Sequence, residues 1–109
     1  EFLWAKSHIS MQRFDFQGLE ETIRQIKGKP VYFTLDLDVL DPSVFPGTGT
    51  PEPGGVTFEE LRKAVTLVCS EANVVVCDVN ELSPHFDSSG VSTVTACKIV
   101  REMLLALSK

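Results

Sequence analysis

The sequence predicts an α/β fold with a parallel sheet between helices, and two observations carry this prediction. Two runs, Val31–Leu37 and Val74–Val79, are dense in apolar, aromatic and β-branched residues and follow chain-breaking residues. Such runs are typical of strands that are covered on both faces. A helical pattern lies between them and supplies the crossover that parallel strands need, which is almost always right-handed. The 109 residues, 43% hydrophobic and 23% charged, fit one ordinary domain.

The helix between the strands has a defined start. Thr57 and Glu60 have the spacing of a capping box, in which each side chain satisfies the other residue's backbone amide. Apolar residues then recur at helical spacing: Leu61, Ala64, Val65 and Val68. We therefore expect a helix that begins after Thr57 and packs this stripe against the sheet.

Two further helices are expected on either side of this unit. A short one over Leu19–Lys27 leads into the first strand, and a long one runs from about Ser92 to Leu107. The apolar stripe predicted for the long helix consists of Val94, Cys97, Val100, Leu104 and Leu107. Residues Glu1–Phe16 have no pattern that assigns them to an element.

Two strands of this kind do not make a stable sheet by themselves. Both have the composition of interior strands, and an isolated two-stranded sheet is marginal in water. The sequence therefore predicts that the chain is one end of a larger α/β domain. Missing sequence, a partner chain or an unrecognised strand near Ile9 could supply the neighbours.

Charge and cysteine content exclude several classes of protein. The net charge of −5 offers no basic surface for nucleic acid or an anionic membrane. No apolar run approaches the roughly 18 residues of a membrane-spanning helix, so we expect a soluble chain. Cys69, Cys77 and Cys97 are an odd number in apolar surroundings, which predicts buried free thiols and a reducing, cytoplasmic compartment.

Asp36 and Asp38 form a carboxylate pair at the end of the first strand. The two-residue period places both on one face and Leu37 on the other. Like charges held this close need a compensating cation, and ligands gather at the carboxyl ends of parallel strands. Oxygen ligands favour Mg²⁺ or Mn²⁺, and Mn²⁺ gains if imidazoles join. The alternative is a pair of solvated or backbone-capping aspartates.

The segment after the pair predicts a rigid pocket wall. Asp41-Pro42 is a turn signal, and Asp41 is expected to accept loop amides or orient the metal ligands rather than bind metal. Phe45–Gly55 holds four glycines and three prolines, so its backbone is fixed at defined angles. It lacks the Gly-Lys-Ser/Thr ending of a phosphate-binding loop.

Glu81 follows the second strand and can reach the same edge of the sheet. A carboxylate there could bind a metal, act as a base or pair with a planar guanidinium. Asp78, inside the strand, is expected to be structural. His85 is expected to be a loop residue more than a site residue, and His8 has no assigned role.

These motifs resemble a known family. Asp36–Pro42, Pro46–Pro51, Gly54-Gly55 and Asp78–Pro84 are similar to the C-terminal signatures of the ureohydrolases, the arginase and agmatinase family, and are closest in texture to agmatinases. The resemblance implies a three-layer α/β/α, arginase-like fold with a mainly parallel sheet. It also implies two Mn²⁺ ions per site, a small guanidino substrate, and a homo-oligomer, either a trimer or a hexamer.

The resemblance also assigns roles to residues. Asp36 and Asp38 would bind manganese, Glu81 would hold the substrate guanidinium, and Thr50 would line the pocket nearby. Hydrolysis of the guanidino C–N bond would release urea and a diamine such as putrescine, as in polyamine biosynthesis. The family's remaining metal ligands, a histidine and an Asp-x-His-x-Asp block, lie N-terminal to these motifs and do not occur here. We therefore expect residues 1–109 to be the C-terminal portion of one ureohydrolase catalytic domain, inactive or very weak alone.

Three alternatives stay open. Arginase, guanidinobutyrase and formimidoylglutamase share these motifs. The run Phe33–Val39 is also similar to the strand and Asp-x-Asp of haloacid-dehalogenase-type phosphatases, in which the first aspartate is a nucleophile and Mg²⁺ the cofactor. An interaction module that kept the fold without catalysis is the third.

Overall fold

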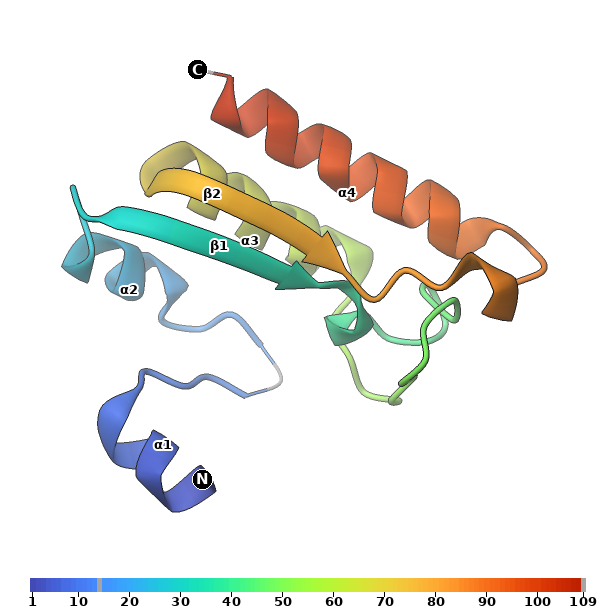
Figure 1. Ribbon diagram of the computed structural model, residues 1–109, viewed down its shortest axis with the longest axis horizontal. Helices are drawn as coiled ribbons and strands as arrows, with labels where there is room; N and C mark the ends of the chain where they lie inside the picture. The colour runs from blue at the N-terminus through green and yellow to red at the C-terminus, as the bar shows by residue number, and fades with distance from the viewer. Residues whose placement is uncertain (14, 109) are drawn as a thin grey trace.

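A parallel pair of strands forms the centre of the computed structural model, which describes residues 1–13 and 15–108. β1 (Pro30–Asp36) lies beside β2 (Asn73–Asn80), with Leu35 opposite Val79 (Figure 1). The register shifts once, between Val31 and Tyr32. Both predicted strands and their parallel pairing are confirmed, with each boundary displaced by one residue.

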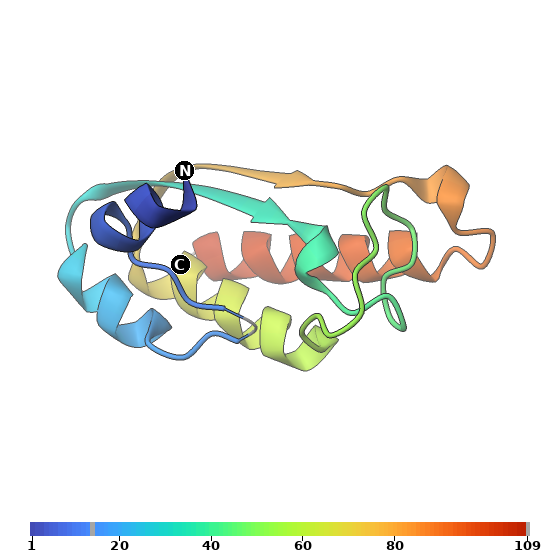
Figure 2. The same ribbon diagram turned by 90° about the horizontal axis from the view of Figure 1, so that it is seen from below.

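The helices gather on one side of the sheet. α3 (Phe58–Glu71) and α4 (Val91–Leu107) pack on each other beneath the two strands, and α2 (Leu19–Gln25) lies next to α3 (Figure 2). The capping box at α3 is present, with the Thr57 hydroxyl accepting the Glu60 amide and the Glu60 carboxylate accepting the Thr57 amide. An additional helix, α1 (Phe2–His8), occupies part of the segment that had no assigned element.

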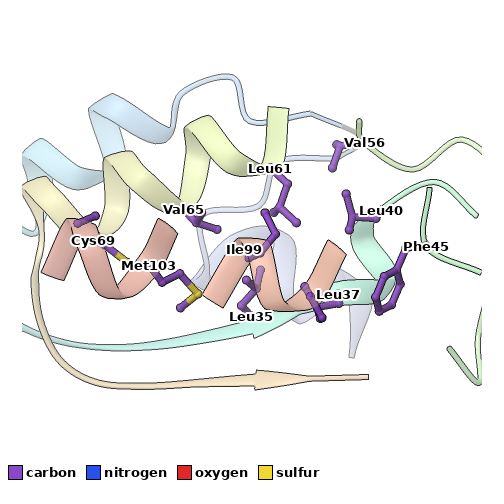
Figure 3. Packing of buried hydrophobic residues seen from close by; sticks show 12 residues of the cluster. Leu35, Leu37, Leu40, Phe45, Val56, Leu61, Val65, Cys69, Ile99 and Met103 are labelled. Carbon is purple, nitrogen blue, oxygen red and sulfur yellow. The ribbon is translucent and has the colours of Figure 1, made fainter. Parts of the chain in front are cut away.

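The core lies between the sheet and these two helices. Leu35, Leu37, Leu61, Val65 and Ile99 converge there (Figure 3). The loop after β1 joins the same core, because Leu40, Phe45 and Val56 are buried with it. The loop that borders the carboxylates is therefore anchored by apolar packing rather than hanging free in solvent.

The other face of the sheet is uncovered by the described residues. Tyr32, Val75 and Val76 are 63%, 59% and 57% exposed. Within residues 1–13 no strand forms near Ile9, which follows α1 in extended backbone. Within the described residues, no helix has the length and apolar character needed to cross a membrane.

The stripe predicted for α4 is wrong except at Leu107, which is half-buried against the core. The residues that α4 buries are Ser92, Ala96, Ile99, Met103 and Ala106, whereas Val94 and Leu104 are 70% and 61% exposed. α4 is apolar on more than one face, so periodicity alone could not select the face that packs on α3. Cys97 moves to the exposed side with this rotation, and Cys77 is exposed as well, so only Cys69 is the buried thiol expected. All three cysteines are free.

Candidate functional site

Three carboxylates meet at the edge of the sheet where both strands end. Asp36 is the last residue of β1, Asp38 lies in the short 3₁₀ turn η1 (Leu37–Val39), and Glu81 directly follows β2. One oxygen from each carboxylate lies within 4.8 Å of the others. The parallel pairing of Asp36 with Asn80 explains the convergence, because it brings both carboxyl ends to one edge.

The backbone around Asp36 and Asp38 sorts their side chains. As predicted, Leu37 points to the opposite side from the two aspartates: Leu37 is fully buried, while Asp36 and Asp38 lie in the carboxylate cluster at the surface. The chain achieves this with a 3₁₀ turn rather than a continued strand, because β1 ends at Asp36. The core residue Leu37 thus fixes the two carboxylates on the side away from the core.

Glu81 adopts a costly backbone conformation. It is the one non-glycine residue with positive φ, 70°, among those the structure describes. The left-handed region costs a residue with a Cβ about 1–2 kcal/mol, and such strain is concentrated at functional sites. Nothing in the local sequence signals this conformation, because glutamate has no preference for it.

The cluster carries uncompensated negative charge. Of the ion pairs formed within residues 1–13 and 15–108, none includes Asp36, Asp38 or Glu81. The pKa of Asp36 is raised, first by partial burial and then by the charges of Asp38 and Glu81. A cation relieves this repulsion, so the donor set fits a hard divalent metal such as Mn²⁺.

Two threonines of the glycine- and proline-rich loop contact the cluster. Thr50 donates its hydroxyl hydrogen to Oδ2 of Asp38 at 2.6 Å, as its predicted place beside the site requires. Thr48 donates to Oε2 of Glu81 at 3.3 Å. Thr48 was missed by sequence reasoning, although its two-residue spacing from Thr50 was a usable signal. Both hydroxyls can orient a carboxylate without adding charge.

Asp41 stands outside the cluster and fastens the base of the loop. Its carboxylate accepts the amides of Ser43 and Gly54, both at 2.9 Å. These hydrogen bonds, those from Ser43 first, lower the pKa of Asp41. Gly55 allows the chain to close, since a Cβ there would lie 2.5 Å from the Asp41 nitrogen. Asp41 therefore acts on loop geometry, as one of its predicted roles requires.

Asp78 and the two histidines are separate from the cluster. Asp78 accepts hydrogen bonds from Tyr32, Thr34 and Asn80 on the open face of the sheet, which lower its pKa and match its structural role. His85 is exposed, and its ring contacts that of Phe86 at an interplanar angle of 45°. His8 stacks on Trp4, far along the chain from the site.

A cavity of about 650 Å³ opens beside Asp38. Its walls come from the segment around residues 15–19 and from the loop Glu52–Val56. Asp15 and Glu52 line it together with Asp38, and no described lining residue is a lysine or an arginine. Glu21 also lines it, but its carboxylate is paired with Arg24 at 2.6 Å. The space next to the carboxylate cluster is thus acidic.

Comparison of the sequence with models of protein families identifies the family of this chain. The model of the arginase family matches residues 2–106. This chain belongs to the arginase family. The predicted resemblance is confirmed, and membership of the arginase family decides against the phosphatase alternative.

Individual relatives agree with this membership. The chain is 45% identical to a Bacillus anthracis agmatinase over 112 residues, which is all of this chain and 39% of that protein. It is 38% identical to the human mitochondrial guanidino acid hydrolase, over all of this chain and 29% of that protein. The structure also superposes on a crystal structure of a Clostridium difficile protein with a TM-score of 0.89 and 47% sequence identity. The superposition covers 98% of this chain and 39% of the other. The fold is therefore arginase-like, and the chain spans well under half the length of these relatives.

Proposed function

We propose that this chain is the C-terminal portion of a manganese-dependent ureohydrolase that cleaves agmatine to putrescine and urea. The observation that carries the proposal is the cluster of Asp36, Asp38 and Glu81, whose oxygens lie within 4.8 Å in a member of the arginase family. The rest of the active site would come from sequence outside these 109 residues, because the chain offers no histidine at the cluster.

Asp36 and Asp38 are the residues that would bind two manganese ions together with ligands from the remainder of the enzyme. Bound divalent metal lowers the pKa of water and so supplies a nucleophile for hydrolysis at neutral pH. Thr50 holds Asp38 through its 2.6 Å hydrogen bond, which keeps one carboxylate oxygen in a fixed direction. Leu37, buried in the core, prevents the pair from rotating away.

Glu81 is the residue proposed to hold the guanidinium of the substrate. A planar guanidinium pairs with both oxygens of a carboxylate, and this pairing sets its orientation. Thr48 donates a hydrogen bond to one of these oxygens at 3.3 Å and so favours one orientation of the carboxylate. The positive φ of Glu81 supports this role, because strained backbone conformations are concentrated at functional sites.

The acidic cavity favours agmatine over a guanidino acid. Agmatine carries an amine at the end remote from its guanidinium, whereas a guanidino acid carries a carboxylate there. Asp15 and Glu52 on the cavity wall would attract the amine and repel the carboxylate. The higher identity to the agmatinase than to the guanidino acid hydrolase, 45% against 38%, points the same way. Arginase, guanidinobutyrase and formimidoylglutamase activities are the remaining candidates.

The setting of the enzyme is part of the same proposal. Three free cysteines, two of them exposed, fit a reducing compartment such as the cytoplasm. A homo-oligomer, either a trimer or a hexamer, is proposed from the family resemblance alone.

The decisive experiment uses the complete protein that carries this chain. Urea release is measured with agmatine, arginine and guanidinobutyrate, and formamide release with formimidoylglutamate, before and after removal of metal with a chelator. We expect agmatine to be the preferred substrate and Mn²⁺ to restore the activity lost to chelation. Preference for another of the four would correct the substrate, while calorimetry showing no Mn²⁺ uptake would favour a non-catalytic interaction module.

A further inference from the structure

A buried polar link joins the loop beside the carboxylates to the start of α4. Ser92, fully buried, accepts the Gly47 amide at 2.7 Å and donates its own amide to Oδ2 of Asp87 at 2.8 Å. The carbonyl of Gly47 accepts the amide of Ser83 at 2.7 Å. We call Gly47, Ser83, Asp87 and Ser92 the Gly47 clamp. It ties the loop, the segment after β2 and α4 to one another.

The clamp tolerates little movement. A Cβ at Gly47 would lie 2.7 Å from the Cβ of Ser92 and 3.1 Å from that of Asp87, so only glycine permits this approach. Asp87 is 9% exposed, and its pKa is held well below the usual range by the Ser89 hydroxyl first and the Ser92 amide next. A buried, charged and fully bonded carboxylate of this kind is a rigid anchor.

The clamp holds Glu81 from both sides. Thr48 follows Gly47 in the chain, is 4% exposed, and donates to the Glu81 carboxylate at 3.3 Å. Ser83 follows Glu81 by two residues and is fixed to the Gly47 carbonyl. The positive φ of Glu81 persists only if its surroundings hold it there. The contacts on the two sides of Glu81 supply that support.

We propose that Asp87 and Ser92 are positioning residues that act through Gly47 and Thr48 to orient the Glu81 carboxylate toward the substrate guanidinium. This inference rests on the proposed function of Glu81. Neither Asp87 nor Ser92 belongs to the carboxylate cluster. Changing either residue should therefore weaken substrate binding at Glu81 without removing a metal ligand.

The test is Ser92→Ala in the complete protein, which removes the acceptor of the Gly47 amide. We expect KM for the guanidino substrate to rise about tenfold, while kcat and manganese content stay within about twofold of the wild type. Ser70→Ala in α3 is the matched control, because the Ser70 hydroxyl bonds only a carbonyl of its own helix. It should leave all three quantities unchanged.

A double-mutant cycle separates positioning from general destabilisation. If Ser92 acts through Thr48, then Thr48→Val raises KM in the wild type and adds little in the Ser92→Ala background. Additive effects, or a fall in kcat and melting temperature with KM unchanged, would overturn the proposal. Should Ser92→Ala not fold, the cycle is run with Asp87→Asn, which preserves the shape of the side chain.

A further measurement does not depend on activity. Amide hydrogen exchange at Ser83 should accelerate about tenfold or more in Ser92→Ala relative to Ser70→Ala, because the Gly47 carbonyl loses its fixed position. Unchanged exchange in an active enzyme would show that the clamp does not hold this segment. A wild type that releases no urea from any guanidino substrate would instead overturn the proposed function. Amide exchange at Ser83 would still test whether the Gly47 clamp holds this segment, because it does not depend on activity.

Discussion

The hydroxyl of Thr50 bonds Oδ2 of Asp38 at 2.6 Å across twelve positions of sequence. This contact joins the glycine- and proline-rich loop to the carboxylate cluster at the one aspartate that lies in a turn rather than in a strand. Asp41 fastens the base of the same loop by accepting amides at its two ends. The loop is thus a support for the carboxylates as well as a wall of the neighbouring cavity.

Asp38→Ala should lower manganese content and activity together. The substitution removes one of the two carboxylates proposed to bind metal, and loss of a ligand weakens binding by far more than it affects the fold. Metal analysis and urea release of the complete protein check this. Glu71→Ala, an exposed carboxylate at the end of α3, is the control and should change neither. Full manganese content in Asp38→Ala would remove Asp38 from the ligand set.

Glu81→Ala should raise KM for guanidino substrates while largely sparing the metal. A two-point, charge-assisted contact to guanidinium is lost, so the rise in KM should be on the order of 30- to 100-fold. Steady-state kinetics and metal analysis on the same preparation make the comparison. Metal loss equal to that of Asp38→Ala would show that Glu81 is a ligand, as its 4.8 Å proximity allows.

Local patterns predicted the parts of the fold that depend on neighbouring residues. The apolar runs located β1 and β2, and the Thr57–Glu60 spacing located the start of α3. The carboxylate cluster was expected from two simple rules, of which the shared edge of parallel strands holds. The two-residue alternation stops at Asp36, where β1 ends, and a 3₁₀ turn places Asp38 beside it. These rules act within a few residues or between paired strands, so sequence expresses them directly.

Contacts between distant segments were beyond the same reasoning. Gly47 and Ser92 are 45 positions apart, and neither residue type signals a partner. The buried face of α4 is set by packing against α3, with Ala96 and Ile99 inside and Val94 outside, and hydrophobicity does not distinguish these residues. The positive φ of Glu81 is likewise imposed by its surroundings.

The isolated 109-residue chain should be poorly soluble or self-associating. Apolar side chains are exposed on the open face of the sheet, such as Val75 and Val76, and on the outer face of α4, such as Val94 and Leu104. Surfaces of this kind associate unless they are covered. Sedimentation of the purified chain over a range of concentrations measures this directly. A monomer that unfolds cooperatively would contradict the proposal that it is part of a larger domain.

Gly47→Ala should destabilise the complete protein by about 1–3 kcal/mol, because the added Cβ would overlap Ser92. Gly49→Ala is a control two residues away, where a Cβ would meet nothing within 4 Å. Urea denaturation compares the two variants with the wild type under one set of conditions. Equal stability of both variants would mean that the loop moves freely away from α4.

Asp87→Asn should change the acid end of the stability profile. The pKa of Asp87 is lowered in the folded protein, so its charged form contributes stability above the unfolded pKa of about 3.9, and this contribution is lost as pH falls through the folded pKa. Between about pH 5 and pH 8 the free energy of unfolding of the wild type should exceed that of Asp87→Asn by a constant amount. This whole range lies above both the folded and the unfolded pKa of Asp87, so its carboxylate is charged in both states. Below about pH 4 the difference should shrink, because the unfolded wild-type chain takes up a proton at Asp87 while the folded protein still holds that carboxylate charged. Glu71→Gln, an exposed carboxylate, serves as the control. A difference that stays the same down to pH 2 would show that the charge of Asp87 contributes nothing and that only the shape of its side chain matters to the clamp.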